Sequence, residues 1–405
     1  MLRAASALVR IPSWGGDETP AQEQVAALVS DAGLTLDQWD IDVAGTQKHP
    51  DCSWEIEREH AMGVVGSLEG SGDGPILLLN GHVDVVPPGD ERLWAHPPFS
   101  GVVADGFLHG RGALDMKGPL MAGLYALKAV RGSGVRLRGS ARLVSVVGEE
   151  DGGLGTLAAI LRGYTGDGAI VMEPTDLAVA PVQAGCLNFR LRVPGLAAHG
   201  AVREEGVSAF EKLFVVFQAL QRLEQERNAV IEDPGYARYR IPYPISVGTL
   251  GGGDWASSVP DHARMEGRIG VRPGETLAEA RAALEGCVAQ AAAADAFLSA
   301  HPPLVEWWGG RFLPASTPLD HPVASTLMQA VGGVTGRPAR IEGVTFGADA
   351  GLLQHVGNTR SVLFGAGDIR AAHRPDERVR VADLETMGRA LAAMIVGFCG
   401  VDGGL

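Results

Sequence analysis

Short apolar runs alternate with helix-like segments along residues 1–180. The runs at 77–80, 142–147 and 169–172 are brief and rich in β-forming side chains, as expected for strands buried in a mostly parallel sheet. Residues 120–130 read as a buried helix between two of these runs. The alternation predicts an α/β architecture, in which functional groups lie in loops beyond the carboxyl ends of the strands.

The pattern changes near Gly185. Asn188, Arg190 and Arg192 alternate with apolar neighbours, which predicts a strand with one exposed face. Helices and further strands are predicted after it, at 207–227, 245–250, 263–271 and 277–294. Two strand–helix units of this kind indicate a small α+β domain whose sheet is covered by helices on one side.

After residue 312 the α/β pattern resumes, with a helix, an apolar strand at 361–364 and a final helix at 382–398. The smaller domain is therefore predicted to be inserted into the larger one. The predicted boundaries are 1–183 and 310–405 for the larger domain and 184–309 for the inserted domain.

Charge and composition narrow the classes of partner. The 405 residues carry a formal net charge of −14 at pH 7, which argues against nucleic acid and anionic membrane surfaces. No window approaches the roughly 20 apolar residues of a membrane span, and the N-terminal stretch reads as a helix and not as a signal peptide. Four scattered cysteines without a CxxC pair fit reduced thiols. We expect a soluble cytoplasmic protein.

Candidate chemistry begins with His82 and Asp84, directly after an apolar run. Side chains two apart on a strand share a face, so Asp84 can hydrogen-bond the ring nitrogen of His82 that does not bind metal and fix its tautomer. Asp115 lies where a glycine-rich loop turns into a helix. A metal ligand and a helix N-cap are equally compatible with that position.

Three consecutive carboxylates, Glu149, Glu150 and Asp151, follow another apolar strand. They should repel one another unless a cation or solvent screens them, and a solvated acidic turn is the alternative. Glu173 ends a buried strand, as a ligand or a helix cap, and His373 follows a later one. Carboxylates and two histidines at strand ends are together typical of a site for zinc, cobalt or manganese.

In this order the clusters resemble the M20 family of two-metal peptidases and deacylases, which includes aminoacylase, acetylornithine deacetylase and succinyl-diaminopimelate desuccinylase. The motifs are GHVDVVP, GRGALDMKG and GEEDGG, and the match runs from Gly81 to Glu377. The resemblance implies a zinc-peptidase-like catalytic domain, an inserted lid or dimerisation domain, and a homodimer. It also implies two divalent ions per subunit, with zinc expected and cobalt or manganese as alternatives.

The same resemblance assigns a role to each cluster. His82 and Glu173 would hold one metal, Glu150 and His373 the other, and Asp115 would bridge both. Glu149 would be the general acid/base, taking a proton from a water molecule that the metals activate and passing it to the departing amine.

The inserted domain carries His199 in the segment GLAAHG. In the family, a histidine of this motif lies near the active site of the partner subunit, where it stabilises the oxyanion. Without the resemblance it would be an ordinary loop histidine. Asp349 matches a further family position near the site, although the usual preceding Thr is Ala348.

Two substrate-binding positions depart from the family pattern. Many relatives have an Asn and a carboxylate-binding Arg where this chain has Ser257 and Gly270. Arg268 and Arg272 flank Gly270 on the same strand face, so either could bind a substrate carboxylate, and both could equally be solvated charges. The sequence thus indicates the type of reaction more closely than the identity of the substrate.

The sequence therefore predicts a metal-dependent deacylase acting on an N-acyl amino acid or a related small, peptide-like amide. A dipeptidase or carboxypeptidase of the same family is the nearest alternative. A non-catalytic metal-binding dimer is the alternative from another class, and the intact Glu149 speaks against it. The chain has no GxGxxG fingerprint and no GxSxG elbow, which argues against an oxidoreductase and a serine hydrolase.

Overall fold

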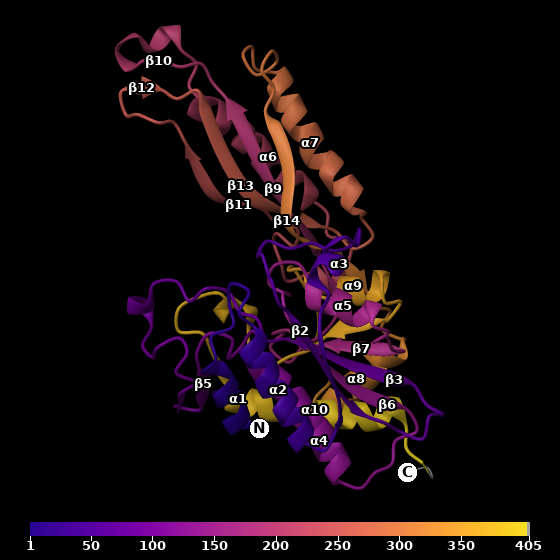
Figure 1. Ribbon diagram of the computed structural model, residues 1–405. Helices are drawn as coiled ribbons and strands as arrows, with labels where there is room; N and C mark the ends of the chain where they lie inside the picture. The colour runs from indigo at the N-terminus through magenta and orange to yellow at the C-terminus, as the bar shows by residue number, and fades with distance from the viewer. Residues whose placement is uncertain (403–405) are drawn as a thin grey trace. The chain divides into compact units, whose positions relative to one another are not determined.

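The computed structural model describes residues 1–402, which form two compact units (Figure 1). Unit 1 consists of Met1–Gln183, Ala315–Val344 and the chain from Ala348 onward. Unit 2 consists of Ala184–Pro314 and the short segment Thr345–Gly347. Unit 2 therefore interrupts unit 1 along the chain.

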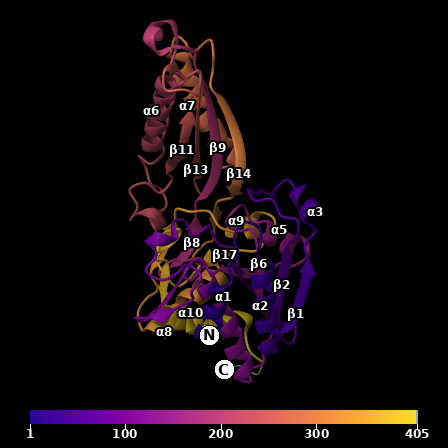
Figure 2. The same ribbon diagram turned by 60° about the vertical axis from the view of Figure 1, so that its left-hand side comes forward.

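Unit 1 is built on a nine-stranded mixed sheet. Its order is β1-β2-β6-β3-β7-β17-β8-β15, and β16 pairs with β8 beside that path. The four strands from β6 to β17 are parallel, whereas β1, β2, β8 and β15 extend this centre through antiparallel pairs. Figure 2 shows β1, β2 and β6 side by side at one end. The strands are β1 (Thr35–Asp40), β2 (Met62–Leu68), β3 (Ile76–His82), β6 (Ser140–Val146), β7 (Gly168–Val171), β8 (Val179–Gln183), β15 (Ala315–Ser316), β16 (Ile341–Val344) and β17 (Ser361–Leu363).

The apolar runs predicted as strands form β3, β6, β7 and β17, all in the parallel centre of the sheet. Their residues are almost all buried, because helices cover this part of the sheet. This confirms the predicted α/β architecture with a mostly parallel core.

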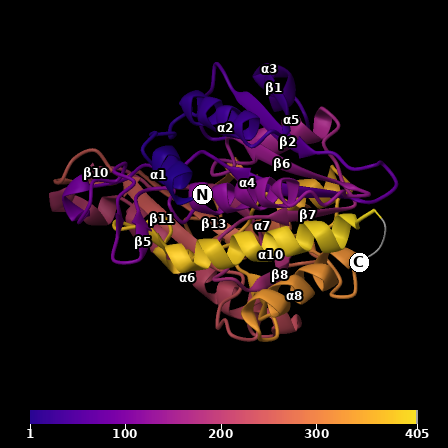
Figure 3. The ribbon, with the colours of Figure 1, turned by 90° about the horizontal axis from the view of Figure 1, so that it is seen from below.

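Helices pack against this sheet. Helix α10 packs between α4 and α8 (Figure 3), while α5 contacts β2 and β6 and packs on α9. The helices of unit 1 are α1 (Leu2–Val9), α2 (Thr19–Asp31), α3 (Val43–Gln47), α4 (Lys117–Gly132), α5 (Leu154–Leu161), α8 (Pro322–Thr335), α9 (Ala350–His355) and α10 (Val381–Cys399). None of the helices in residues 1–402 combines the length and apolar character that a membrane span requires.

A small three-stranded sheet, β18-β5-β4, joins two loops of unit 1 that are far apart in sequence. Its strands are β4 (Val103–Ala104), β5 (Phe107–His109) and β18 (Arg378–Arg380). Because β18 pairs with β5, the segment before Arg378 is held beside the glycine-rich loop after His109.

Unit 2 contains a four-stranded antiparallel sheet in the order β11-β13-β9-β14 and a two-stranded ribbon, β10-β12. Its elements are β9 (Gly185–Pro194), β10 (Ala198–His199), α6 (Ala209–Arg227), β11 (Ile245–Gly252), β12 (Ser258–Val259), β13 (His262–Val271), α7 (Leu277–Ala293) and β14 (Leu304–Phe312). Helices α6 and α7 pack on each other, and both contact β13.

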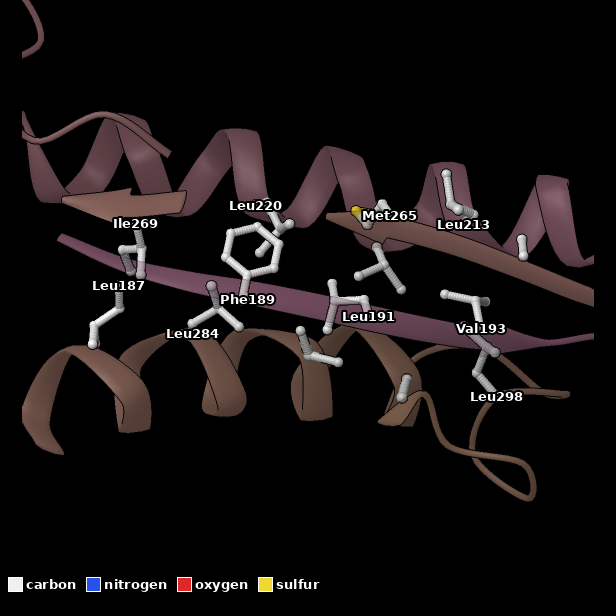
Figure 4. Packing of buried hydrophobic residues seen from close by; sticks show 14 of the residues in the cluster. Leu187, Phe189, Leu191, Val193, Leu213, Leu220, Met265, Ile269, Leu284 and Leu298 are labelled. Atoms are coloured by element: carbon white, nitrogen blue, oxygen red, sulfur yellow. The ribbon is translucent and has the colours of Figure 1, made fainter. Parts of the chain in front are cut away.

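The core of unit 2 follows the period of two along β9. Leu187, Phe189, Leu191 and Val193 are buried and point to the helices (Figure 4), where Leu284 of α7 belongs to the same cluster. The intervening polar residues of β9 lie on the other face of the sheet. The half-exposed strand predicted from the alternation is therefore confirmed.

Candidate active site

Three of the predicted clusters meet at one edge of the unit 1 sheet. His82 is the last residue of β3, Glu149 and Glu150 follow β6, and Glu173 follows β7. These strands are parallel neighbours in the order β6-β3-β7, so their carboxyl ends lie side by side. His82 Nε2 lies 3.7 Å from Glu173 Oε1 and 3.9 Å from Glu149 Oε2.

The other two clusters reach this edge through the small sheet. Asp115 comes from the loop between β5 and α4, and His373 from the segment before β18. His373 Nε2 lies 3.5 Å from Asp115 Oδ2 and 3.1 Å from Glu150 Oε2. Asp115 Oδ1 lies 3.3 Å from His82 Nε2, so its carboxylate stands between the two histidines.

Several polar atoms at the centre of this cluster lack partners. Among residues 1–402, His82 Nε2, Asp115 Oδ1 and Glu173 Oε1 are buried without a hydrogen bond. Buried polar atoms are almost always paired, and converging oxygen and nitrogen lone pairs are what a divalent cation requires. Two sets offer ligand atoms within 4.8 Å of one another: His82, Glu149 and Glu173, and His82, Asp115 and Glu150. The side chains present therefore fit a divalent-metal site.

The electrostatics of the cluster point the same way. Burial, followed by the charge of Glu173, raises the pKa of Glu149 well above its usual value. Burial, followed by the charge of Asp115, does the same to the pKa of Glu173. Burial and the neighbouring negative charges thus both disfavour the ionised forms of Glu149 and Glu173, a penalty that bound cations would relieve.

The pKa values of both histidines are also raised, but here neighbouring negative charges act against burial. Burial lowers the pKa of His373, but the charges of Glu150 and Asp115 outweigh it and raise that pKa to about 11. Burial likewise lowers the pKa of His82, and nearby carboxylates, first that of Asp84, raise it well above its usual value. Burial raises the pKa of Asp115, yet the two histidines outweigh burial and hold it below its usual range.

The prediction that the Asp84 carboxylate accepts a hydrogen bond from the ring of His82 is wrong. His82 Nδ1 lies 2.9 Å from the backbone carbonyl oxygen of Asp84, whereas 3.7 Å separates it from Oδ1 of the carboxylate. The rule for residues two apart fails because β3 ends at His82 and the chain has turned by Asp84. The carbonyl still favours the tautomer that leaves Nε2 available to a metal.

The Asp84 carboxylate instead holds the turn that follows β6. Its Oδ2 accepts a hydrogen bond from the backbone N–H of Glu150 at 2.9 Å. Asp84 therefore acts on the position of Glu150 as well as on the tautomer of His82.

The alternative of Asp115 as a helix cap is also wrong. Helix α4 begins at Lys117 after Met116, and no side chain caps it. The backbone N–H of Asp115 donates to Glu377 Oε1, and Arg111 Nη1 donates to the other oxygen of Glu377. This buried pair orients Asp115. No role was predicted for Arg111 or Glu377, because no local spacing relates residues 266 positions apart.

Asp349 is buried in unit 1, directly before α9. Its Oδ2 accepts a hydrogen bond from Thr156 Oγ1 at 2.5 Å, and Asn80 Nδ2 donates to the same hydroxyl at 2.8 Å. Burial raises the pKa of Asp349 to about 6, although the bond from Thr156 opposes the shift. The charge of Asp349 also contributes to the raised pKa of Glu149, so Asp349 lies close enough to influence the cluster.

The remaining predicted residues belong to unit 2. His199 is exposed on β10, whose partner β12 begins directly after Ser257, and the N–H of Gly200 donates to the Ser257 carbonyl. Arg268 lies within β13. Arg272 lies just beyond that strand, where its guanidinium donates to the carbonyl of Arg227.

Known proteins resemble this chain in sequence and in fold. Over 398 residues it is 28% identical to an N-formyl-4-amino-5-aminomethyl-2-methylpyrimidine deformylase of Bacillus subtilis (strain 168), covering 93% of this chain and 89% of that protein. The fold matches the dipeptidase Dug1p of Saccharomyces cerevisiae with a TM-score of 0.77 at 16% identity, over 98% and 95% of the two chains. A dinuclear metal-binding M20 peptidase of Bacillus subtilis matches with a TM-score of 0.62 at 16% identity, over 98% and 97%.

These relatives agree with the resemblance and the fold class inferred from the sequence, both of which are confirmed. The family model described as peptidase family M20/M25/M40 matches residues 78–396, which is most of the chain and contains all five clusters at the sheet edge. The chain is a hydrolase and belongs to peptidase family M20/M25/M40.

Proposed function

We propose that this chain is a metal-dependent deacylase that hydrolyses the amide bond of a small N-acyl substrate. The observation that carries the proposal is the convergence of acidic and histidine side chains around buried, unpartnered ligand atoms. The members are His82, Asp115, Glu149, Glu150, Glu173 and His373.

The distances support two neighbouring cation positions. His82 and Glu173 would hold one ion, Glu150 and His373 the other, and Asp115 would bridge them from its place between the histidines. Zinc suits this mixture of nitrogen and oxygen ligands, with cobalt or manganese as alternatives. When bound, such ions supply Lewis-acid polarisation of the scissile carbonyl and of a water molecule.

Glu149 is the proposed general acid/base. It is buried at the same edge, and burial raises its pKa well above that of an ordinary carboxyl, which favours its acting as an acid as well as a base. Its carboxylate can take a proton from the attacking water and deliver it to the departing amine nitrogen. Glu149 Oε2 lies 3.9 Å from His82 Nε2, and Oε1 of the proposed ligand Glu173 lies 3.7 Å from the same atom, so the role of Glu149 rests on the family resemblance and not on distance.

Substrate recognition is proposed to involve unit 2. The Nε atoms of Arg268 and Arg272 are both buried without a hydrogen-bond partner in residues 1–402. Arg272 already donates through Nη2 to a backbone carbonyl, which makes Arg268 the better candidate for a substrate carboxylate. Gly270, in place of the usual Arg, also fits an amide without a carboxylate. The name of the Bacillus subtilis relative describes such an amide, an N-formyl aminomethylpyrimidine.

We further propose a cytoplasmic homodimer in which unit 2 serves as the lid and dimerisation domain. His199 would stabilise the oxyanion of the partner's substrate, and its exposure on β10 is compatible with this role. Asp349 and Ser257 remain candidates for contact with substrate.

The deciding experiment measures amine release from N-acyl amino acids, dipeptides and the N-formyl aminomethylpyrimidine. Each is assayed after chelation and after adding back zinc, cobalt or manganese. We expect turnover to return with metal and to favour an N-acyl substrate; preference for dipeptides would favour a peptidase. Glu149→Gln should bind metal normally but lose roughly 10²–10⁴-fold in kcat. Bound metal without turnover on any substrate would support the non-catalytic alternative.

A further inference from the structure

We propose that Arg58 is a positioning residue for the turn at residues 148–152, which carries Glu149 and Glu150. This inference rests on the proposed function of those two glutamates. Arg58 comes from a segment without regular secondary structure, between α3 and β2, and its side chain is buried. An arginine is buried in a protein only where its charge is paired, so its partners show what it holds.

Arg58 grips Asp151, the third carboxylate of the acidic turn, with two parallel hydrogen bonds. Nη2 donates to Oδ1 at 2.7 Å and Nη1 donates to Oδ2 at 2.8 Å. This two-pronged geometry fixes the orientation of a carboxylate as well as its position. The positive charge of the guanidinium also offsets the negative charge of Asp151, which reduces the repulsion expected among the three consecutive carboxylates.

The other side of the guanidinium is anchored to the start of α2. Nε and Nη2 donate to Glu18 Oε1 at 3.1 and 2.8 Å, and Glu18 is itself buried directly before Thr19. Nη1 also donates to the carbonyl of Ile56 at 3.2 Å. All three guanidinium nitrogens are thus engaged, and Arg58 ties the turn to a helix in the fixed frame of unit 1.

The turn is shaped around this side chain. Gly148 has a φ of 67°, and a Cβ there would lie 3.2 Å from Arg58 Cζ, so the guanidinium packs directly on the backbone before Glu149. Backbone N–H groups of Glu55 and Ile56 donate to Asp151 Oδ2 at 3.1 and 3.0 Å. The segment around Arg58 and the turn therefore form one connected unit.

The turn is held on both sides of the proposed base. Asp84 holds the N–H of Glu150, and Arg58 holds the side chain of Asp151 and packs on Gly148. Catalytic groups lose efficiency when displaced by as little as about 1 Å. Lysine would keep the charge but cannot make the paired bonds, so Arg58→Lys should displace the turn without leaving Glu18 and Asp151 unneutralised.

The test compares Arg58→Lys with Arg162→Lys in the metal-loaded, full-length protein. Arg162 is the matched control, since it makes a similar two-pronged pair with Asp37 on the surface, at 2.8 and 2.9 Å. We expect Arg58→Lys to lower kcat by roughly 10- to 100-fold, with KM within about twofold and the metal content unchanged. Arg162→Lys should match the parent in each measurement.

A second variant, in case Arg58→Lys does not fold, removes all three buried charges together. It carries Glu18→Gln, Arg58→Met and Asp151→Asn. If the network only stabilises the fold, this variant will have parental kcat at temperatures where it is folded. Parental kcat in both variants would overturn the proposal.

The visible absorption spectrum of the cobalt-loaded protein separates this inference from the proposed function. Glu150 is a proposed ligand, so a displaced turn should change the spectrum of Arg58→Lys but not that of Arg162→Lys. The proposed function would fail if Glu149→Gln kept full turnover or if no substrate were cleaved. In either case the cobalt spectrum of Arg58→Lys would still test whether Arg58 positions the turn. An unchanged spectrum would then overturn the positioning role.

Discussion

At the scale of single residues, Asp349 shows what burial near the site costs. Its Oδ2 accepts from Thr156, while Oδ1 is buried and finds no partner within residues 1–402. Burial raises the pKa of Asp349 from 3.8 to about 6, so its protonated form is favoured in the folded state. Because the folded state then binds more protons than the unfolded state, stability should fall as pH rises between those two values.

Asp349→Asn should remove this loss. The free energy of unfolding of the variant minus that of the parent should increase by about 3 kcal/mol between a pH below the unfolded pKa of 3.8 and a pH above the folded pKa of about 6. At the higher pH the variant should be the more stable protein. Chelated proteins are compared by urea unfolding across this range. The exposed Asp73, changed to Asn, is the control. A constant difference between Asp349→Asn and the parent across the range would refute the prediction.

Residues of the candidate site could be predicted from the sequence where they lie in short local motifs. His82, Asp115 and Glu149 each follow a recognisable strand or glycine-rich loop, and parallel strands bring such positions together. Arg58 was not predicted, because its partners are 40 and 93 positions away and no motif surrounds it. The repulsion expected among three consecutive carboxylates indicated only that a cation or solvent must screen them, and not that Arg58 pairs with one of them.

At the scale of elements, β9 separates an apolar face from a charged one. Leu191 is fully buried in the core of unit 2, whereas its neighbour Arg192 is exposed and forms an ion pair with Glu306 on the adjacent strand β14. Leu191→Ala should destabilise unit 2 by about 2–5 kcal/mol, because it leaves a cavity in a packed core. Arg192→Ala, one position away, should cost at most about 1 kcal/mol.

Denaturant unfolding followed by hydrogen exchange of the β9 amides would measure both variants. Equal losses for the two substitutions would mean that the alternation along β9 does not decide its stability.

Several long helices were predicted to within a few residues, whereas helix α2 and strand β14 were not predicted. The final helix was expected at 382–398 and spans Val381–Cys399. The helix expected at 207–227 begins at Ala209, because Ser208 accepts a hydrogen bond from the N–H of Glu211 and caps it. The short strands β4 and β18 were missed, since their pairing leaves no periodic pattern in the sequence.

At the scale of the whole molecule, the proposed dimer can be tested by mixing two inactive variants. If His199 serves the partner's site, His199→Ala and Glu149→Gln subunits should form heterodimers with one complete site each. Random reassociation should then restore about 25% of the parental kcat, since half of the dimers are mixed and each has one working site of two.

The control mixes each variant with a chain carrying both substitutions, where no complete site can form. Mass spectrometry under native conditions would verify the heterodimers. No recovery in verified heterodimers of two inactive variants would mean that His199 acts within its own subunit.

The place where unit 2 leaves unit 1 has a consequence for how such a chain could arise. Gln183, the last residue of unit 1 before the interruption, is paired with Ala315, the first residue after it, in the antiparallel ladder of β8 and β15. Chain ends that already lie hydrogen-bonded side by side can be joined by a tight turn, so β8 and β15 are in effect the two arms of a hairpin whose tip has been expanded into unit 2. Apart from the unit 2 segment Thr345–Gly347, the connectivity of the nine-stranded sheet and its candidate metal site therefore does not depend on unit 2. Evolution could exchange the proposed recognition module at this hairpin while leaving that edge of the sheet unaltered.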